Sequence, residues 1–307
     1  MNGSASVGYN PVFGPSDQLF LSDSTFCPNS ELMTSEKSSV TLLGIPFDES
    51  SSFLRGAAQA PPKIREALHS PSTNLSTESG YDLSAETRFR DLGDLSLPSG
   101  TAAFVAIEQG VSELLESGDR MVALGGDHAV TYPVIRAFAK QYDRFTLLHL
   151  DAHPDLYDEF DGNRLSHACP FARIMEEGLV HRLVQMGIRT TTPHQKDQVE
   201  RFGVEVVTAA QWTDSVVTEL DGPVYLSLDL DVIDPSFVPG VSHHEPGGVS
   251  VRDVLGVVQS INGPLIGADI VEYNPVRDVN DVTAMVAAKC LKAVSYTHLT
   301  LPTNREV

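Results

Sequence analysis

The chain has 307 residues, of which 41 are Asp or Glu and 21 are Lys or Arg, so its formal charge is −20. This charge argues against a nucleic acid or an anionic membrane as partner, and it favours a cationic small molecule or divalent metal ions. The length and the ordinary apolar content suit one large α/β domain and exclude a fibrous or wholly disordered protein.

The first 38 residues differ from the rest of the chain. Residues 1–38 are rich in Ser, Gly, Pro and Asn with little hydrophobic periodicity, which predicts a flexible arm. They contain no basic segment followed by an apolar run, and no later stretch reaches the roughly 18 apolar residues of a membrane span. The three cysteines have no CxxC spacing, which favours free thiols. We therefore expect a cytoplasmic protein that spans no membrane.

Short apolar runs then recur along residues 39–294, and each predicts a strand buried on both faces. They are VTLLGIP (40–46), RMVALGG (120–126), RFTLLHL (144–150), RLVQMGI (182–188), GPVYLSL (222–228) and PLIGADIV (264–271). Helix signals lie between them, such as Pro62 in APPKIREAL and the run VTYPVIRAFAKQY. This alternation is typical of a parallel sheet covered by helices, so we expect one α/β domain over residues 39–294.

Polar residues gather directly after three of these strands, where open α/β sheets bind their ligands. GGDH, DAHPD and SLDLDVIDP contain Asp127, His128, Asp151, His153, Asp155, Asp229 and Asp231. Carboxylates that are buried together repel one another unless cations balance their charge. Two divalent ions would balance four aspartates. Oxygen donors with imidazoles and no thiolate suit manganese, or alternatively cobalt or nickel, better than a structural zinc.

These motifs, in this order, resemble the ureohydrolase family of arginases and agmatinases. LGIPFDESSSFLRGAAQAPPKIREAL upstream and GVSHHEPGG and GADIVEYNP downstream extend the resemblance from about residue 40 to residue 294. YDEFDGNRLSHACPFARIMEEG and VTAMVAAK are most similar to plant-type arginases and their bacterial agmatinase-like relatives. The resemblance implies a three-layer αβα sandwich around an eight-stranded parallel sheet, two Mn²⁺ per subunit with Co²⁺ or Ni²⁺ left open, and a homo-oligomer, either trimer or hexamer.

By motif position, the resemblance also implies two metal sites that share bridging carboxylates. The first site consists of His128, Asp151, Asp155 and Asp229, and the second of Asp151, His153, Asp229 and Asp231. We expect Asp127 and Asp234 to orient neighbouring groups or to cap turns. His243 and His244 are interpreted as loop or pocket residues.

The family's reaction is hydrolysis of a guanidinium group to urea and an amine. A guanidinium carbon resists attack at neutral pH, whereas metal ions lower the pKa of bound water and supply a strong nucleophile. Asp155 would hydrogen-bond this water and accept its proton, His167 matches the family's proton shuttle, and Glu272 matches the carboxylate that binds the guanidinium group. Without the resemblance, His167 is interpreted as a surface-loop histidine, and Glu272 equally well as half of a salt bridge.

The substrate stays open among cationic guanidino compounds. Agmatine, with putrescine as product, and L-arginine, with ornithine as product, are the leading candidates, and guanidinobutyrate and guanidine are alternatives. The loop LYDEFDGNRLS, which contains Tyr157, differs in length from the loop that recognises arginine in animal-type arginases. Two other hypotheses remain: a deacetylase-like amidohydrolase with one zinc, and a catalytically silent relative that binds partners.

The end of the chain is atypical. SYTHLTLPTNREV, residues 295–307, does not resemble the family's end and is not expected to continue the amphipathic helix that DVTAMVAAKCLKAV begins. We interpret it either as a read-through or sequence-assembly artefact or as a natural disordered tail.

Overall fold

The computed structural model describes residues 39–213, 220 and 222–300, and the predicted arm at residues 1–38 lies outside them. The described chain contains one eight-stranded parallel sheet with the strand order β2-β1-β3-β8-β7-β4-β5-β6. The strands are β1 (Val40–Gly44), β2 (Phe89–Asp94), β3 (Arg120–Leu124), β4 (Thr146–Leu150), β5 (Arg182–Ile188), β6 (Glu205–Thr208), β7 (Val224–Asp229) and β8 (Leu265–Val271). The predicted α/β class and the eight-stranded parallel sheet are confirmed.

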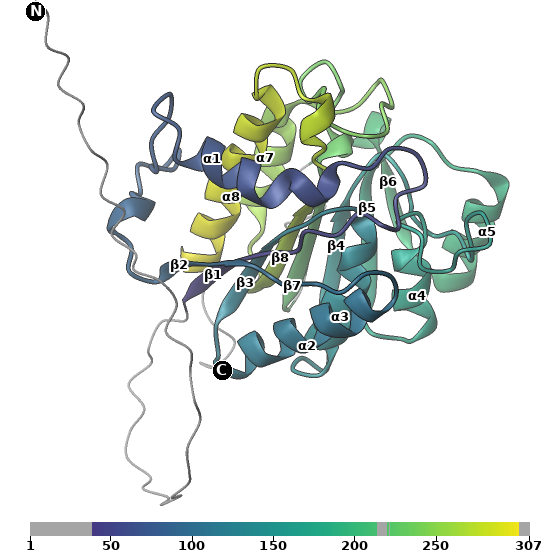
Figure 1. The fold of residues 1–307 in the computed structure, drawn as a ribbon. Helices are drawn as coiled ribbons and strands as arrows, with labels where there is room; N and C mark the ends of the chain where they lie inside the picture. The colour runs from purple at the N-terminus through teal and green to yellow at the C-terminus, as the bar shows by residue number, and fades with distance from the viewer. Residues whose placement is uncertain (1–38, 214–219, 221, 301–307) are drawn as a thin grey trace, which may run out of the picture. The chain divides into compact units, whose positions relative to one another are not determined.

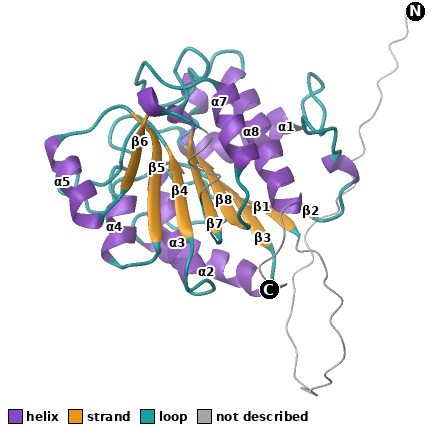
Figure 2. Ribbon diagram, turned by 180° about the vertical axis from the view of Figure 1, so that it is seen from behind, coloured by secondary structure: helices purple, strands orange, loops and turns teal. Residues whose placement is uncertain are grey.

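Helices cover both faces of the sheet and make the three layers visible in Figures 1 and 2. They are α1 (Ala60–Leu68), α2 (Ala102–Glu116), α3 (Thr131–Ala139), α4 (Pro170–Glu176), α5 (Pro193–Phe202), α7 (Val251–Ser260) and α8 (Val282–Thr300). One hydrophobic cluster joins α1, α7 and α8 to the sheet, and a second joins α2, α3 and α4 to it. No helix of the described residues is long and apolar enough to cross a membrane.

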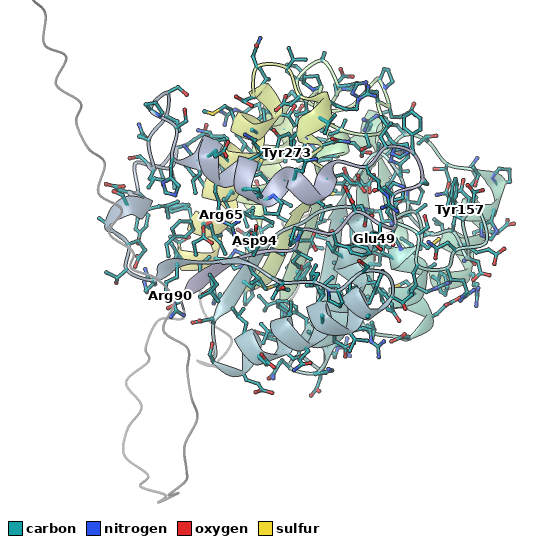
Figure 3. All side chains as sticks on the ribbon, viewed as in Figure 1. Glu49, Arg65, Arg90, Asp94, Tyr157 and Tyr273 are labelled. Atoms are coloured by element: carbon teal, nitrogen blue, oxygen red, sulfur yellow. The ribbon has the colours of Figure 1, made fainter. Side chains whose placement is uncertain are left out.

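The six predicted strands are all present, and the two that were not predicted individually are the edges of the sheet. The inner strands β1, β3, β4, β7 and β8 are buried at every residue, because helices cover both of their faces. The edge strands β2 and β6 have only exposed or half-buried residues, so they lack the apolar signal. Arg65 of α1 holds β2 through Asp91 at 2.7 Å and the Gly93 carbonyl at 2.9 Å, and it lies beside Asp94 in Figure 3.

Local sequence explains where several helices begin and end. The predicted helices APPKIREAL and VTYPVIRAFAKQY correspond to α1 and α3. α5 begins with a capping box between Thr192 and Gln195 and ends at Gly203, whose φ of 64° suits glycine. Ser250 and Asp253 form the same kind of capping box at the start of α7.

The prediction that residues from 295 onward do not continue the last helix was wrong for residues 295–300. α8 continues to Thr300, while residues 301–307 lie outside the described part. Because α8 is buried on most of its sides, its polar residues do not need to form a solvent-exposed face. The Thr297 hydroxyl donates to the Ala293 carbonyl at 3.1 Å, but Ser295 Oγ and His298 Nε2 are buried without a partner in the described chain. The helix therefore includes these residues at a cost in stability.

Candidate metal centre

The structure brings all six proposed metal ligands together at the carboxyl ends of the inner strands. His128 follows β3, Asp151 and His153 follow β4, and Asp229 and Asp231 lie at the end of β7. These strands lie close together because only β8 and β7 separate β3 from β4 in the sheet. Asp155 joins them from the turn after β4, where its φ of 48° is a strained conformation that recurs at functional sites.

His128 faces three carboxylates from one side of the cluster. Its Nδ1 lies 3.0 Å from Asp229 Oδ2, 3.2 Å from Asp151 Oδ2 and 3.3 Å from Asp155 Oδ2. Its Nε2 lies 3.0 Å from Ser227 Oγ, and that hydroxyl donates to Asp269 Oδ1 at 2.7 Å. The hydroxyl therefore accepts from the Nε2–H group, which leaves the Nδ1 lone pair directed at the carboxylates and available to a metal ion.

His153 lies on the opposite side of the cluster from His128. Its Nδ1 lies 3.0 Å from Asp231 Oδ2 and 3.3 Å from Asp151 Oδ1. The donor atoms of these three residues are close enough to hold one ion. Backbone amides orient the carboxylates: Ala152 N–H donates to Asp231 Oδ1 at 3.1 Å, and Asp231 N–H donates to Asp229 Oδ1 at 2.7 Å. Asp151 is common to both sides, as expected of a bridging ligand.

The electrostatics of the cluster favour cations. Burial and the charges of Asp231 and Asp151 raise the pKa of Asp229 well above its ordinary value. Burial also acts to raise the pKa of Asp151, but the imidazoles of His149, His128 and His153 outweigh it and hold that pKa well below its ordinary value. Divalent ions would relieve the repulsion among these carboxylates, and the donor set of carboxylate oxygens and imidazole nitrogens suits them.

His149 also belongs to the cluster, although none of the three sequence motifs contains it. It lies within β4, two residues before Asp151, with its Nε2 2.7 Å from Asp151 Oδ2. The Gln185 amide nitrogen lies 3.0 Å from His149 Nδ1 and donates to it, so the imidazole proton is on Nε2 and points at Asp151. His149, His128 and Asp151 could hold an ion by distance alone, but this proton favours His149 as the group that orients Asp151.

His167 and Glu272 form a buried pair beside the cluster. His167 Nδ1 lies 2.7 Å from Glu272 Oε1, and His167 Nε2 lies 2.7 Å from Ser52 Oγ. Burial acts to lower the pKa of His167, but the charge and hydrogen bond of Glu272 outweigh it and raise that pKa to about 9. His167 is 7% exposed, so it is not a surface-loop histidine.

Glu272 is held by the backbone as well as by His167. Its Oε1 also accepts from the His128 amide at 2.8 Å, and its φ of 63° is left-handed, which is uncommon for a residue other than glycine. Within the described residues, Oε2 of Glu272 has no hydrogen-bond partner, which leaves it available to a ligand.

A pocket of about 170 Å³ opens onto the proposed metal ligands and the His167–Glu272 pair. Its lining residues come from the metal cluster, the buried pair and several other segments: Ser52, His153, Asp155, Tyr157, Phe160, His167, Ala168, Thr190, Thr192, Gln195, Asp229, Asp231, His243 and Glu272. Tyr157 contacts Phe160 edge to face at 5.2 Å between ring centroids and stacks on His194 of α5 at 5.8 Å. The pocket is smaller than the about 300–1,000 Å³ of drug-sized sites, so it suits a molecule near the size of one amino acid.

Asp127 and Asp234 cap turns, and His243 and His244 are pocket and loop residues, as predicted. Asp127 caps the turn that begins at His128 by accepting from the Ala129 amide, and Asp234 accepts from the amides of Ser236 and Gly247. His243 lines the pocket, and His244 bonds the Pro239 carbonyl at 2.8 Å.

Comparison with known proteins identifies similar chains. The model of the Arginase family matches residues 38–295. "Arginase 1, mitochondrial" of Oryza sativa subsp. indica is 44% identical over 276 residues, which cover 84% of this chain and 81% of that protein. "Agmatinase" of Bacillus anthracis is 33% identical over 268 residues, which cover 84% and 91%. The solved structure "Arginase from Medicago truncatula" has a TM-score of 0.81 and 40% identity, covering 85% of this chain and 88% of that one.

Proposed function

The chain belongs to the arginase family, and we propose that it hydrolyses the guanidino group of a cationic small molecule to urea and an amine. Members of this family are hydrolases that act on the C–N bonds of amidines, and they depend on a binuclear metal centre. The observation that carries the proposal is the convergence of six His and Asp side chains, four of which line one pocket together with the His167–Glu272 pair.

We propose two Mn²⁺ per subunit, with Co²⁺ or Ni²⁺ as alternatives, held by the residues named for the two sites above. When bound, the ions supply an activated water as the nucleophile at neutral pH. Asp155 lines the pocket at the edge of the cluster, and its carboxylate would accept the proton of the attacking water.

The buried pair is suited to handle the substrate and the leaving group. Glu272 is suited to pair with the planar guanidinium cation through its free Oε2. Because the pKa of His167 is raised to about 9, its imidazole is protonated at neutral pH and can donate the proton that the leaving amine requires.

The test is urea release by purified, manganese-loaded protein with L-arginine, agmatine, guanidinobutyrate and guanidine offered in parallel. We expect urea from at least one of the two leading candidates, agmatine or L-arginine, and none after the metal is removed with a chelator. No urea from any of the four compounds, with two metal ions bound, would contradict the proposed reaction.

Counting bound metal ions separates the two rival hypotheses. A deacetylase-like amidohydrolase would bind one zinc, whereas the proposed enzyme binds two ions. A catalytically silent relative would release no more urea than a variant that lacks a metal ligand, so equal urea release by wild type and His128→Ala would favour it.

The remaining proposals concern the oligomeric state, the localisation and the domain boundaries of the protein. We propose a homo-oligomer, trimer or hexamer, in the cytoplasm, with a catalytic domain that begins at residue 39 and includes the whole of α8, and with residues 1–38 as an N-terminal arm. The similar rice protein is named as mitochondrial, so localisation needs its own measurement. Light scattering of the full chain and fractionation of the source cells would test these proposals.

A further inference from the structure

Gln195 is a buried amide on the wall of the proposed active-site pocket. It lies in the first turn of α5, is 4% exposed and lines the pocket that also contains Asp155 and Glu272. Its Oε1 accepts from Thr192 N at 3.1 Å and from Thr192 Oγ1 at 3.3 Å. This capping box determines the orientation of the amide, because only the oxygen can accept from the Thr192 N–H group.

The amide nitrogen of Gln195 is therefore on the side away from the cap, with two hydrogen atoms to donate. Among the described residues, Nε2 of Gln195 has no hydrogen-bond partner. Nε2 is not one of the fully buried side-chain atoms that lack a partner in the described chain, so it reaches open space, where water or a ligand can accept from it. The protein thus keeps a donor at this wall that its own acceptors do not satisfy.

The first turn of α5, in which Gln195 lies, favours a negatively charged acceptor at this wall of the pocket. The hydroxyl group of Thr190 lines the same pocket, and the carboxylates that line it belong to the proposed metal ligands Asp155, Asp229 and Asp231 and to Glu272. The first turn of a helix carries a partial positive charge from its unpaired backbone N–H groups, which stabilises anions. Tyr157, which stacks on α5 through His194 and lies near that helix in Figure 3, supplies an aromatic surface for an aliphatic chain.

We infer that Gln195 is a specificity-determining residue that donates its amide hydrogens to a carboxylate at the far end of the guanidino substrate. This inference rests on the proposed function and narrows its substrate class to guanidino acids such as L-arginine and guanidinobutyrate. Agmatine has no carboxylate, so it leaves the Gln195 donor unpaired and is the poorer substrate.

The decisive variant is Gln195→Glu. Glutamate keeps an oxygen for the Thr192 amide, so the capping box and the melting temperature are preserved. It replaces the free donor with negative charge, which repels a carboxylate and attracts an ammonium group. We expect the ratio of kcat/KM for L-arginine over agmatine to fall by about tenfold or more. An unchanged ratio, or an equal loss for both substrates, would overturn the inference.

Gln211→Glu is the matched control. Gln211 is exposed, does not line the pocket and accepts from the Thr208 hydroxyl at 2.8 Å, which a glutamate can also do. This variant adds the same charge to the protein, so its substrate ratio should stay at the wild-type value. A change as large as that of Gln195→Glu would assign the effect to net charge and overturn the role of Gln195.

A binding measurement separates failure of this inference from failure of the proposed reaction. L-Ornithine and putrescine differ only by the carboxylate, and calorimetry with the manganese-loaded protein gives the affinity of each. We expect wild type to prefer L-ornithine and Gln195→Glu to lose that preference. Tighter binding of L-ornithine without urea release from any substrate would reject the reaction and keep the role of Gln195. Equal or no binding of both amines would overturn that role.

Discussion

His167 Nδ1 lies 2.7 Å from Glu272 Oε1, with both side chains buried beside the metal cluster. Glu272 reaches this position from the end of β8, and His167 reaches it from the loop before α4. Because the carboxylate favours the protonated imidazole, the pKa of His167 is raised to about 9 although burial opposes the charge. The pair therefore joins a protonated imidazole to a carboxylate at neutral pH, which the proposed proton-donor and guanidinium-binding roles require.

His167→Ala should reduce kcat by about 100-fold or more, the usual scale for loss of acid–base catalysis. In wild type, activity should fall as the pH rises through about 9, because the imidazolium loses its proton there. The variant should lack this decline. Urea release measured from pH 6 to pH 10 checks both expectations. His69→Ala, at the exposed end of α1, is the control and should match wild type. A wild-type rate for His167→Ala would reject the proton-shuttle role.

Asp231→Ala should remove one metal ion per subunit and most of kcat, because its Oδ2 lies 3.0 Å from His153 Nδ1 in the second proposed site. The fold should persist, because the first proposed site keeps all four of its ligands and shares only Asp151 and Asp229 with the second. Metal analysis by mass spectrometry and far-ultraviolet circular dichroism check the two expectations. Asp197→Ala, which removes an exposed carboxylate from α5, should keep both ions. Two ions and normal turnover in Asp231→Ala would contradict the ligand assignment.

His149→Ala should weaken manganese binding by about 10- to 100-fold while two ions still bind at saturation, because His149 orients Asp151 through its Nε2–H group. Titration in metal-buffered solution gives both the affinity and the stoichiometry. If the stoichiometry at saturation fell to one ion, His149 would itself be a ligand, which the distances among His128, His149 and Asp151 permit.

His298→Leu should stabilise the protein, most strongly at acid pH. Burial lowers the pKa of His298 to about 3, and its Nε2 has no partner in the described chain. Below pH of about 6.5 the unfolded chain binds a proton that the folded protein does not, so wild type loses up to about 1.4 kcal/mol of stability per pH unit from this group.

Urea unfolding of both proteins at pH 7 and pH 5 checks this expectation. The stability lost between the two pH values should be smaller in His298→Leu than in wild type, whereas His69→Gln at an exposed position should behave as wild type. Equal losses in wild type and His298→Leu would show that His298 does not contribute to acid sensitivity.

The inner strands and most of the metal cluster were predictable from the sequence because their signals are local. A strand covered on both faces must be apolar throughout, so β4 and β7 are recognisable as short runs. Asp151, His153 and Asp155 lie within five residues, and parallel strands place such clusters at one edge of the sheet. The edge strands β2 and β6 and the last turns of α8 escaped prediction because their exposure or burial depends on neighbours distant in sequence.

The sequence by itself determined the fold class, the residue types of the metal cluster and their place at the strand ends, because hydrophobic periodicity and short motifs are local properties of the chain. Only the tertiary structure decided which groups meet: the strand order that brings His128 to Asp229, the Gln185 contact that orients the proton of His149, and the pairing of His167 with Glu272. It also decided that Gln195 reaches the same pocket from α5. These contacts join residues far apart in the chain, and packing of the sheet and its helices sets their distances.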